Sequence, residues 1–287
     1  MSSIGPLVST QWLAERLGDP GIKVIDGSWR MPGDAPARTA YENRHIEGAV
    51  FFDLDEIADR NSDLPHMAPP PAQFEMQIGA LGVSERDTVV IYDDAGCFSA
   101  ARVWWTFRAM GHRNVAVLDG GLPKWLKEDH PVTSARSTTA SAVYRASFKP
   151  DIVCDAAALR AKLSESDALV LDARSQDRFL AKTPEPREGL RSGHMPGAIS
   201  LPYGAVLNND QTFLDKAQLA KVFASAGVTD QTAVVTTCGS GVTAAILSLA
   251  LELTAQSNHK LYDGSWTEWG DCRHDAKEFP VVAGKEN

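Results

Sequence analysis

One cysteine, Cys238, stands between a β-branched run and a glycine-containing turn in the stretch VVTTCGSGVTAAIL, residues 234–247. The run predicts a buried strand, and the apolar residues after the turn predict a helix whose N-terminus lies near the cysteine. Gly239 and Gly241 permit backbone conformations closed to other residues, so successive N–H groups can converge on one point. Such amides and the helix dipole favour negative charge, and they bring thiol pKa values to roughly 3.5–7.5. The pattern therefore predicts a nucleophilic thiolate.

Two chemistries use a cysteine held in a loop of this kind. A cysteine phosphatase needs an arginine six residues after the cysteine, because a guanidinium clamps phosphate through two parallel hydrogen bonds. That position is Ala244, and residues 239–243 carry no basic side chain. Phosphatase activity is therefore disfavoured, and sulfur transfer through a persulfide is the remaining candidate. The alternative to both is a buried structural cysteine beside a tight turn.

The elements around this loop occur twice in the chain. Four blocks recur in one order at a nearly constant offset of about 145 residues, which indicates two copies of one domain. The first copy has Asp93 where the second has Cys238, so only the second copy carries the nucleophile. The paired blocks are 24–29 with 170–175, 44–53 with 193–202, 81–96 with 226–240, and 115–125 with 259–269.

Within each copy, short apolar strand runs alternate with amphipathic helical patterns. This alternation predicts an α/β fold in which each domain is a parallel sheet with helices on both faces. We expect an N-terminal domain over residues 1–136, a linker at 137–150 and a C-terminal catalytic domain over 151–287. Ligands of open parallel sheets bind beyond the carboxyl ends of the strands, which is where the Cys238 loop is expected.

The composition of the chain argues against several classes of protein. The 28 basic and 37 acidic residues give a net charge of −9, which argues against a general nucleic-acid binder. No segment has the features of a signal peptide or a bilayer-spanning helix, so no membrane association is expected. Four cysteines without a CxxC pair suggest neither a disulfide framework nor a metal site, and a reducing cytoplasm is the expected location. The cysteines are Cys97, Cys154, Cys238 and Cys272.

The segments CGSGVTA, YDGSWTEW, GHMPGA and SAARVWW, which begin at residues 238, 262, 193 and 99, resemble the two-domain rhodanese superfamily. The resemblance covers essentially the whole chain and implies two tandem rhodanese-like domains. Relatives that prefer thiosulfate typically carry basic residues just after the cysteine. Because Gly239 and Ser240 are uncharged, the loop favours the branch of the superfamily that uses 3-mercaptopyruvate.

The resemblance also implies a reaction. Cys238 would take sulfur from 3-mercaptopyruvate, release pyruvate, and pass the sulfur to a thiol such as thioredoxin or to cyanide. No metal or organic cofactor is implied, because the enzyme itself holds the sulfur. Arg178 and Arg187 match the two family arginines that hold the substrate carboxylate and carbonyl. The alternative is a pair of solvated loop arginines that form ion pairs with Asp177 or Glu188.

Further site residues follow from the same resemblance. Ser240, His66 and Asp55 match a relay proposed to move the substrate thiol proton, and a histidine suits proton transfer near neutral pH. The alternatives are an ordinary loop histidine and an aspartate that caps a turn. Arg102 is another candidate, for which a structural ion pair is equally compatible. Substrate contacts are also implied for four residues of the cysteine loop, Gly239, Gly241, Val242 and Thr243.

Two rival functions share the nucleophile. One is a thiosulfate sulfurtransferase with the same fold, and the other is a persulfide carrier or interaction module with little turnover. His45 and His194 occupy matching places in both copies, only one of which has the nucleophile, so we interpret them as structural.

The charge of the loop gives a first testable prediction. A basic residue introduced at Ser240, as in Ser240→Lys, should shift donor preference toward thiosulfate, because thiosulfate is a dianion. The measurement is the rate of sulfur transfer with each donor in competition. An unchanged preference would undermine the argument from loop charge.

Overall fold

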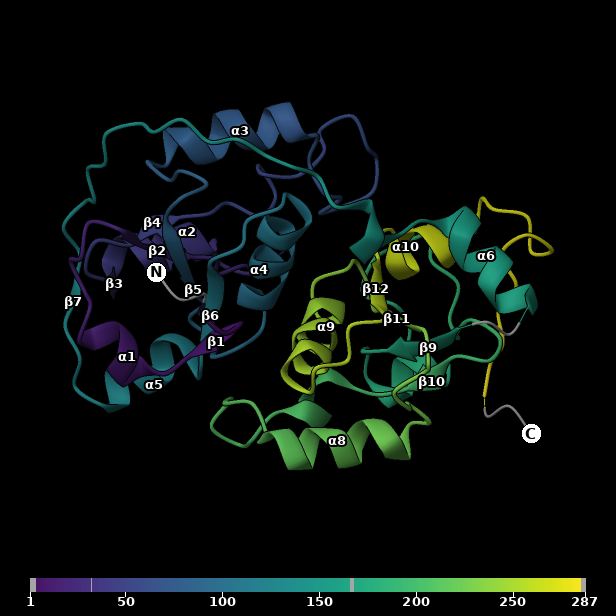
Figure 1. Ribbon diagram of the computed structural model, residues 1–287. Helices are drawn as coiled ribbons and strands as arrows, with labels where there is room; N and C mark the ends of the chain where they lie inside the picture. Colours follow the sequence, from purple (N-terminus) through teal and green to yellow (C-terminus); the bar gives the residue numbers. More distant parts are fainter. Residues whose placement is uncertain (1–3, 32, 166–167, 285–287) are drawn as a thin grey trace. The chain divides into compact units, whose positions relative to one another are not determined.

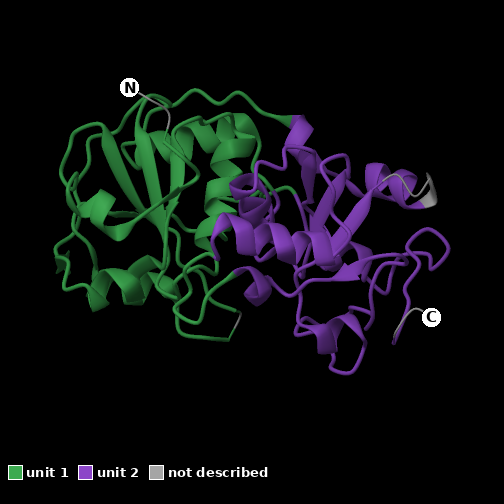
Figure 2. Ribbon diagram, turned by 60° about the horizontal axis from the view of Figure 1, so that its bottom comes forward, with its two compact units in different colours: residues 1–61, 68–149, 207–213 green, residues 62–67, 150–206, 214–287 purple. Residues whose placement is uncertain are grey.

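The computed structural model describes residues 4–31, 33–165 and 168–284, which fold into two compact units (Figures 1 and 2). Unit 1 comprises residues 1–61, 68–149 and 207–213, and unit 2 comprises 62–67, 150–206 and 214–287. Each unit therefore includes a short segment from the other half of the sequence. The continuous domain ranges expected from the sequence contain neither exchange, and they remain a prediction.

The two exchanged segments are equivalent in the repeat. Residues 62–67 and 207–213 lie about 145 residues apart, which is the repeat offset. In each segment a non-glycine residue adopts a left-handed backbone, His66 with φ 64° and Gln211 with φ 66°. Such conformations are uncommon for residues other than glycine, so their recurrence indicates that both copies build this segment in the same way.

Unit 1 is built on a five-stranded sheet in the order β1-β6-β5-β2-β4, and every strand pair in it is parallel. A separate antiparallel pair joins β3 to β7. The strands and helices of this unit are β1 (Leu7–Val8), α1 (Thr10–Ala14), β2 (Ile22–Asp26), α2 (Ala37–Asn43), β3 (His45–Ile46), β4 (Val50–Phe51), α3 (Pro71–Ala80), β5 (Thr88–Tyr92), α4 (Ala100–Ala109), β6 (Val115–Leu118), α5 (Gly121–Lys127) and β7 (Val132–Thr133).

Unit 2 repeats this sheet in the order β10-β9-β11-β12-β8, again with parallel pairs throughout. Since β11 corresponds to β5 and β9 to β2, the two sheets have the same topology, and the predicted duplicated α/β fold is confirmed. The elements of this unit are the 3-10 helix η1 (Pro150–Ile152), β8 (Val153–Cys154), α6 (Ala156–Glu165), β9 (Leu169–Asp172), α7 (Gln176–Phe179), β10 (Ile199–Ser200), the 3-10 helix η2 (Tyr203–Val206), α8 (Lys216–Ser225), β11 (Val234–Thr237), α9 (Ala244–Leu253), β12 (His259–Tyr262) and α10 (Ser265–Trp269).

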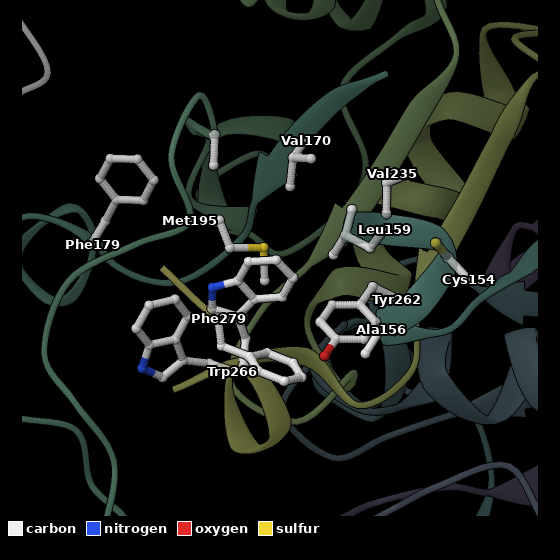
Figure 3. Close-up of a cluster of buried hydrophobic side chains, with 12 residues drawn as sticks. Cys154, Ala156, Leu159, Val170, Phe179, Met195, Val235, Tyr262, Trp266 and Phe279 are labelled. Carbon is white, nitrogen blue, oxygen red and sulfur yellow. The ribbon is translucent and has the colours of Figure 1, made fainter. Parts of the chain in front are cut away.

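Helices cover both faces of each sheet. In unit 2, α9 packs on β11 and β12 and α8 packs on α9, while α6 and α10 lie on the opposite face (Figure 1). Figure 3 shows the core on that second face, where Leu159, Val170, Val235 and Trp266 gather with aromatic neighbours. Because both faces are buried, the strands are continuous apolar runs rather than alternating ones. No helix in the described part of the chain is long and apolar enough to cross a membrane.

The segment expected to act as a linker is packed against unit 1 along part of its length. Tyr144 is 2% exposed, and its ring contacts Phe74 and Phe107 edge-on. His112 Nδ1 lies 2.9 Å from the Tyr144 hydroxyl. The Ser147 and Lys149 N–H groups also donate to α4 and its C-cap. Low sequence periodicity therefore indicates irregular backbone here, not a loose connection.

Asp26, at the carboxyl end of β2, gives a prediction about stability. Burial raises its pKa from 3.8 to about 6, against the hydrogen bond that its side chain accepts from the Ser28 N–H. A raised carboxyl pKa contributes stability that is complete below pH 3.8 and is lost as the pH rises through 6. Asp26→Asn should therefore stabilise the fold by about 3 kcal/mol at pH 7 and have little effect at pH 4.

Urea unfolding of wild type and variant across pH 4 to 7.5 would measure this difference. Asp19→Asn is the matched control, because Asp19 is exposed and the substitution makes the same change of charge. A difference between Asp26→Asn and wild type that does not grow with pH would contradict the assigned cause.

Candidate active site

Cys238 directly follows β11, the central strand of the unit 2 sheet, and it is 2% exposed. Its backbone is held by the start of α10. The Cys238 N–H donates to Ser265 Oγ at 3.2 Å, and the Cys238 carbonyl accepts from the Trp266 N–H at 2.9 Å. The Gly239 carbonyl accepts from the Thr267 N–H at 2.8 Å. Three hydrogen bonds therefore fix the cysteine and the next residue from one side.

The residues that follow Gly239 in the loop offer backbone N–H donors. Among the residues that the structure describes, none accepts a hydrogen bond from the N–H groups of residues 240–244. Helix α9 begins at Ala244, so the helix dipole also favours an anion in this turn. The arrangement matches the predicted anion-binding loop.

The equivalent loop of unit 1 already holds an anion. The buried Asp93 carboxylate accepts from the N–H groups of Ala95, Phe98, Ser99 and Ala100 at 2.7–3.0 Å. Aligned on the strand before the loop and on the helix N-caps Ser99 and Thr243 after it, these four donors correspond to residues 240, 242, 243 and 244. Desolvation raises the pKa of Asp93, and the four N–H bonds oppose that rise. Unit 1 therefore shows where this loop holds a negative charge.

The two loop glycines are needed for different reasons. Gly241 has φ 76°, as the argument from backbone freedom predicts. That argument is wrong for Gly239, whose φ lies outside the left-handed region. A Cβ at Gly239 would lie 3.1 Å from Arg178 Nη2, so glycine lets the guanidinium approach the loop.

Arg178 is the last member of a largely buried network of ion pairs. Its Nε and Nη2 both donate to Glu185 Oε2, and Glu185 Oε1 accepts from Arg174 Nη1 at 2.7 Å. Arg174 also binds Asp172 through Nε and Nη2, and its guanidinium lies 4.0 Å from the centre of a Trp266 ring. Arg178 is thus an ion-paired residue beside the cysteine loop, and its partner is neither Asp177 nor Glu188.

Sequence reasoning missed Arg174, Glu185 and Ser265. The repeat carried a signal for the first of them, because VIDGSW in one copy and VLDARS in the other place Ser28 opposite Arg174. The same kind of asymmetry had pointed to Cys238. Glu185 lies in a segment without periodicity, and nothing in its spacing distinguishes it from a solvated acid.

The residues expected to form the relay lie in both units. His66 belongs to the exchanged segment of unit 2, where its Nδ1 lies 3.1 Å from Ser240 Oγ and both side chains are buried. Asp55 belongs to unit 1, where Trp29 Nε1 donates to both of its carboxylate oxygens at 3.1 Å. The structure therefore brings together Ser240 and His66 within one unit, and the role of Asp55 stays a prediction.

The remaining candidates are placed as follows. Val242 is buried in the loop, and Thr243 is the half-buried N-cap of α9. Arg187 is half-buried on the connection after α7. Arg102 is fully buried in α4, with its guanidinium 4.5 Å from the centre of a Trp105 ring. Among the described residues, no cluster of three or more His, Cys, Asp or Glu side chains is arranged to bind a metal ion.

The other cysteines and the repeated histidines occupy different settings. Cys97 is buried, and desolvation raises its pKa well above the usual value. Burial likewise raises the pKa of Cys154 to about 11. Neither thiol suits nucleophilic attack at neutral pH. His45 and His194 each place Nδ1 within 2.8 Å of a backbone carbonyl oxygen, and both rings stack on aromatic neighbours, which fits the structural interpretation.

The chain thus consists of two copies of one parallel α/β domain, and only the second copy has a cysteine directly after its central strand. The model of the rhodanese-like domain matches residues 9–128 and again residues 155–272. The chain therefore belongs to the rhodanese family.

Relatives of this chain include enzymes named for 3-mercaptopyruvate, for thiosulfate and for both sulfur donors. The 3-mercaptopyruvate sulfurtransferase of Mus musculus is 40% identical over 92% of this chain and 91% of its own length. The thiosulfate sulfurtransferase of the same organism is 41% identical over 97% of this chain and 96% of its own. The crystal structure of SseA from Escherichia coli, described among 3-mercaptopyruvate sulfotransferases, has a TM-score of 0.84 at 36% identity and covers 92% of this chain and 99% of its own. Overall similarity does not separate the two donors.

The bond from Cys238 to Ser265 yields a prediction. Ser265→Ala leaves the buried Cys238 N–H without its acceptor, which should lower the free energy of unfolding by about 1–3 kcal/mol. Urea denaturation would measure the change. Ser225→Ala, on the exposed end of α8, is the control and should have a much smaller effect. Equal effects of the two substitutions would show that the bond does not anchor the loop.

Proposed function

We propose that this chain is a sulfurtransferase that takes sulfur from 3-mercaptopyruvate, holds it as a persulfide on Cys238, and passes it to a thiol. The observation that carries the proposal is the Cys238 loop, in which a cysteine follows the central strand and is itself followed by N–H groups, at residues 240–244, that have no acceptor among the described residues. A persulfide anion is the charge that those donors would stabilise.

The first copy supports this interpretation through geometry. Each carboxylate oxygen of Asp93 is two bonds from Cβ, as is the outer sulfur of a cysteine persulfide. The four N–H groups that bind the Asp93 carboxylate have counterparts at residues 240, 242, 243 and 244. The aspartate of one copy is therefore a model for the loaded cysteine of the other.

The proposed reaction has two half-reactions. In the first, the Cys238 thiolate attacks the sulfur of 3-mercaptopyruvate, an S–S bond forms, and the bond from sulfur to C3 breaks. The electron pair goes to C3 as the enolate of pyruvate, which then takes up a proton. In the second, an acceptor thiolate attacks the outer sulfur of the persulfide, and the Cys238 thiolate is released. No external oxidant is required, because the sulfur is transferred and the electrons balance.

Side chains beside the loop have proposed roles in the first half-reaction. Arg178 and Arg187 bind the substrate carboxylate and carbonyl, since a guanidinium pairs with a planar carboxylate. Ser240 and His66 relay the proton between the substrate thiol and the pyruvate carbon, and their 3.1 Å separation suits such a step. Asp55 would orient the histidine. Gly239, Gly241, Val242 and Thr243 supply the loop backbone around the transferred sulfur.

The choice of donor depends on the loop. Gly239 and Ser240 carry no charge, so the turn lacks the cations that would suit a dianion. Thiosulfate is the second candidate donor, because the thiosulfate sulfurtransferase of Mus musculus is as similar overall as the mercaptopyruvate enzyme. Both donors would form the same persulfide.

The acceptor and the location are also proposals. A small thiol or the thiol of a protein such as thioredoxin fits the second half-reaction, and cyanide is an alternative acceptor. All four cysteines are free, which suits a reducing cytoplasm.

An intact-protein mass spectrum after incubation with each donor tests the proposal. We expect a gain of one sulfur atom that cyanide removes, formed much faster with 3-mercaptopyruvate than with thiosulfate. Cys238→Ser should abolish the gain and lower transfer at least a thousandfold, since without the thiolate no covalent route remains.

Cys272→Ser is the matched control, because Cys272 is the exposed cysteine and should retain full loading on Cys238. Faster loading by thiosulfate would keep the mechanism and change the donor. No loading by either donor would favour a binding module without turnover.

A further inference from the structure

The network that ends at Arg178 is buried except at that last residue. The side chains of Asp172, Arg174 and Glu185 are at most 1% exposed, whereas Arg178 is 24% exposed. A buried ion pair is costly to break, because the remaining charge loses both its partner and its solvent. The network therefore has one rigid end and one end that can meet a ligand.

Glu185 has no freedom to turn away from Arg178. Its Oε1 is held by Arg174, which is itself fixed by Asp172, by the Gly193 carbonyl at 2.8 Å and by stacking on Trp266. Its Oε2 is therefore presented to Arg178 from a fixed position. This makes Glu185 the residue that sets where the Arg178 guanidinium lies.

The contact with Glu185 leaves one particular edge of Arg178 available. A guanidinium has a side fork, made by Nε and one terminal nitrogen, and an end fork, made by both terminal nitrogens. Glu185 occupies the side fork, and Arg178 Nη1 donates no hydrogen bond to any described residue. Nη2 lies against Gly239, so the available end fork is beside the cysteine loop.

The net charge of the network also favours a ligand with a single carboxylate. Within the network, the two carboxylates of Asp172 and Glu185 cancel the two guanidiniums of Arg174 and Arg178. A ligand with one carboxylate adds a single negative charge to a neutral cluster, whereas a dianion adds two. The end fork also matches the planar geometry of one carboxylate.

We infer that Glu185 is a positioning and specificity-determining residue. It holds Arg178 against Gly239 and offsets the charge of that arginine, so that the site takes a monoanionic 2-oxo acid in preference to a dianion such as thiosulfate. This inference rests on the proposed function, because it assigns the donor class of the same site.

Two substitutions separate the effect of the Glu185 charge from its effect on the position of Arg178. Glu185→Gln keeps the shape and removes the charge. It should increase the ratio of kcat/KM for thiosulfate to that for 3-mercaptopyruvate about tenfold, since the lost repulsion acts on two charges of the dianion and on one charge of the oxo acid. Glu185→Asp keeps the charge but is one methylene too short to reach both arginines. It should raise the KM for 3-mercaptopyruvate and leave the donor ratio within about twofold of wild type.

Glu188→Gln is the matched control. It makes the same change of charge three residues away on an exposed side chain, where solvent screens the effect, and it should leave both KM values unchanged. Circular dichroism establishes that each variant is folded before kinetics are measured. Equal losses with both donors in Glu185→Gln, or wild-type kinetics in both Glu185 variants, would overturn the inference.

Chemical modification of Arg178 tests the positioning role of Glu185 without depending on catalytic turnover. The rate at which phenylglyoxal modifies Arg178, followed by peptide mass spectrometry, should rise several-fold in Glu185→Asp, because the shorter side chain leaves the side fork accessible. The rate in Glu188→Gln should equal that of wild type. Equal rates in all three proteins would overturn the positioning role. If wild-type Cys238 loads from neither donor, the proposed function fails, and the labelling alone then decides whether Glu185 holds Arg178.

Discussion

The site depends on the way α10 holds the backbone of Cys238 and Gly239. Three hydrogen bonds, to Ser265 Oγ and from the Trp266 and Thr267 N–H groups, use the polar groups on one side of the loop. The N–H groups of residues 240–244 have no acceptor among the described residues. Trp266 serves a second purpose, because its ring also supports the Arg174 guanidinium. One short helix thereby positions both Cys238 and the charged network beside it.

Much of this arrangement could be predicted from the sequence. The apolar strands and the repeat indicated the two parallel sheets, and the glycine-containing turn after a strand indicated the loop at Cys238. The role of Gly241 also followed, since only a backbone of φ 76° makes that turn. These features are local or repeated, so they leave a pattern that a single sequence displays.

What could not be predicted arises from contacts between distant segments. Arg178 approaches Gly239 so closely that a Cβ there would be in tight contact with it, and Ser265 meets Cys238 from 27 residues away. Glu185 has an ordinary neighbourhood in the sequence and gains its importance only where the chain folds it between two arginines. Similarly, the exchange of residues 62–67 into unit 2, which brings His66 to Ser240, has no signature in composition.

The Asp93 carboxylate has a consequence for how the two halves of the chain behave during turnover. In unit 1 the loop binds the internal Asp93 carboxylate through four N–H groups, so its order does not depend on any reaction. In the mechanism proposed for unit 2, the corresponding donors would gain an anion of the same reach only while sulfur is bound to Cys238. Whatever binds only the folded state stabilises it, so the resistance of the second half to local opening should rise and fall with each catalytic cycle. In this mechanism the local stability of unit 1 stays constant during turnover, whereas that of unit 2 changes with the chemical state of Cys238.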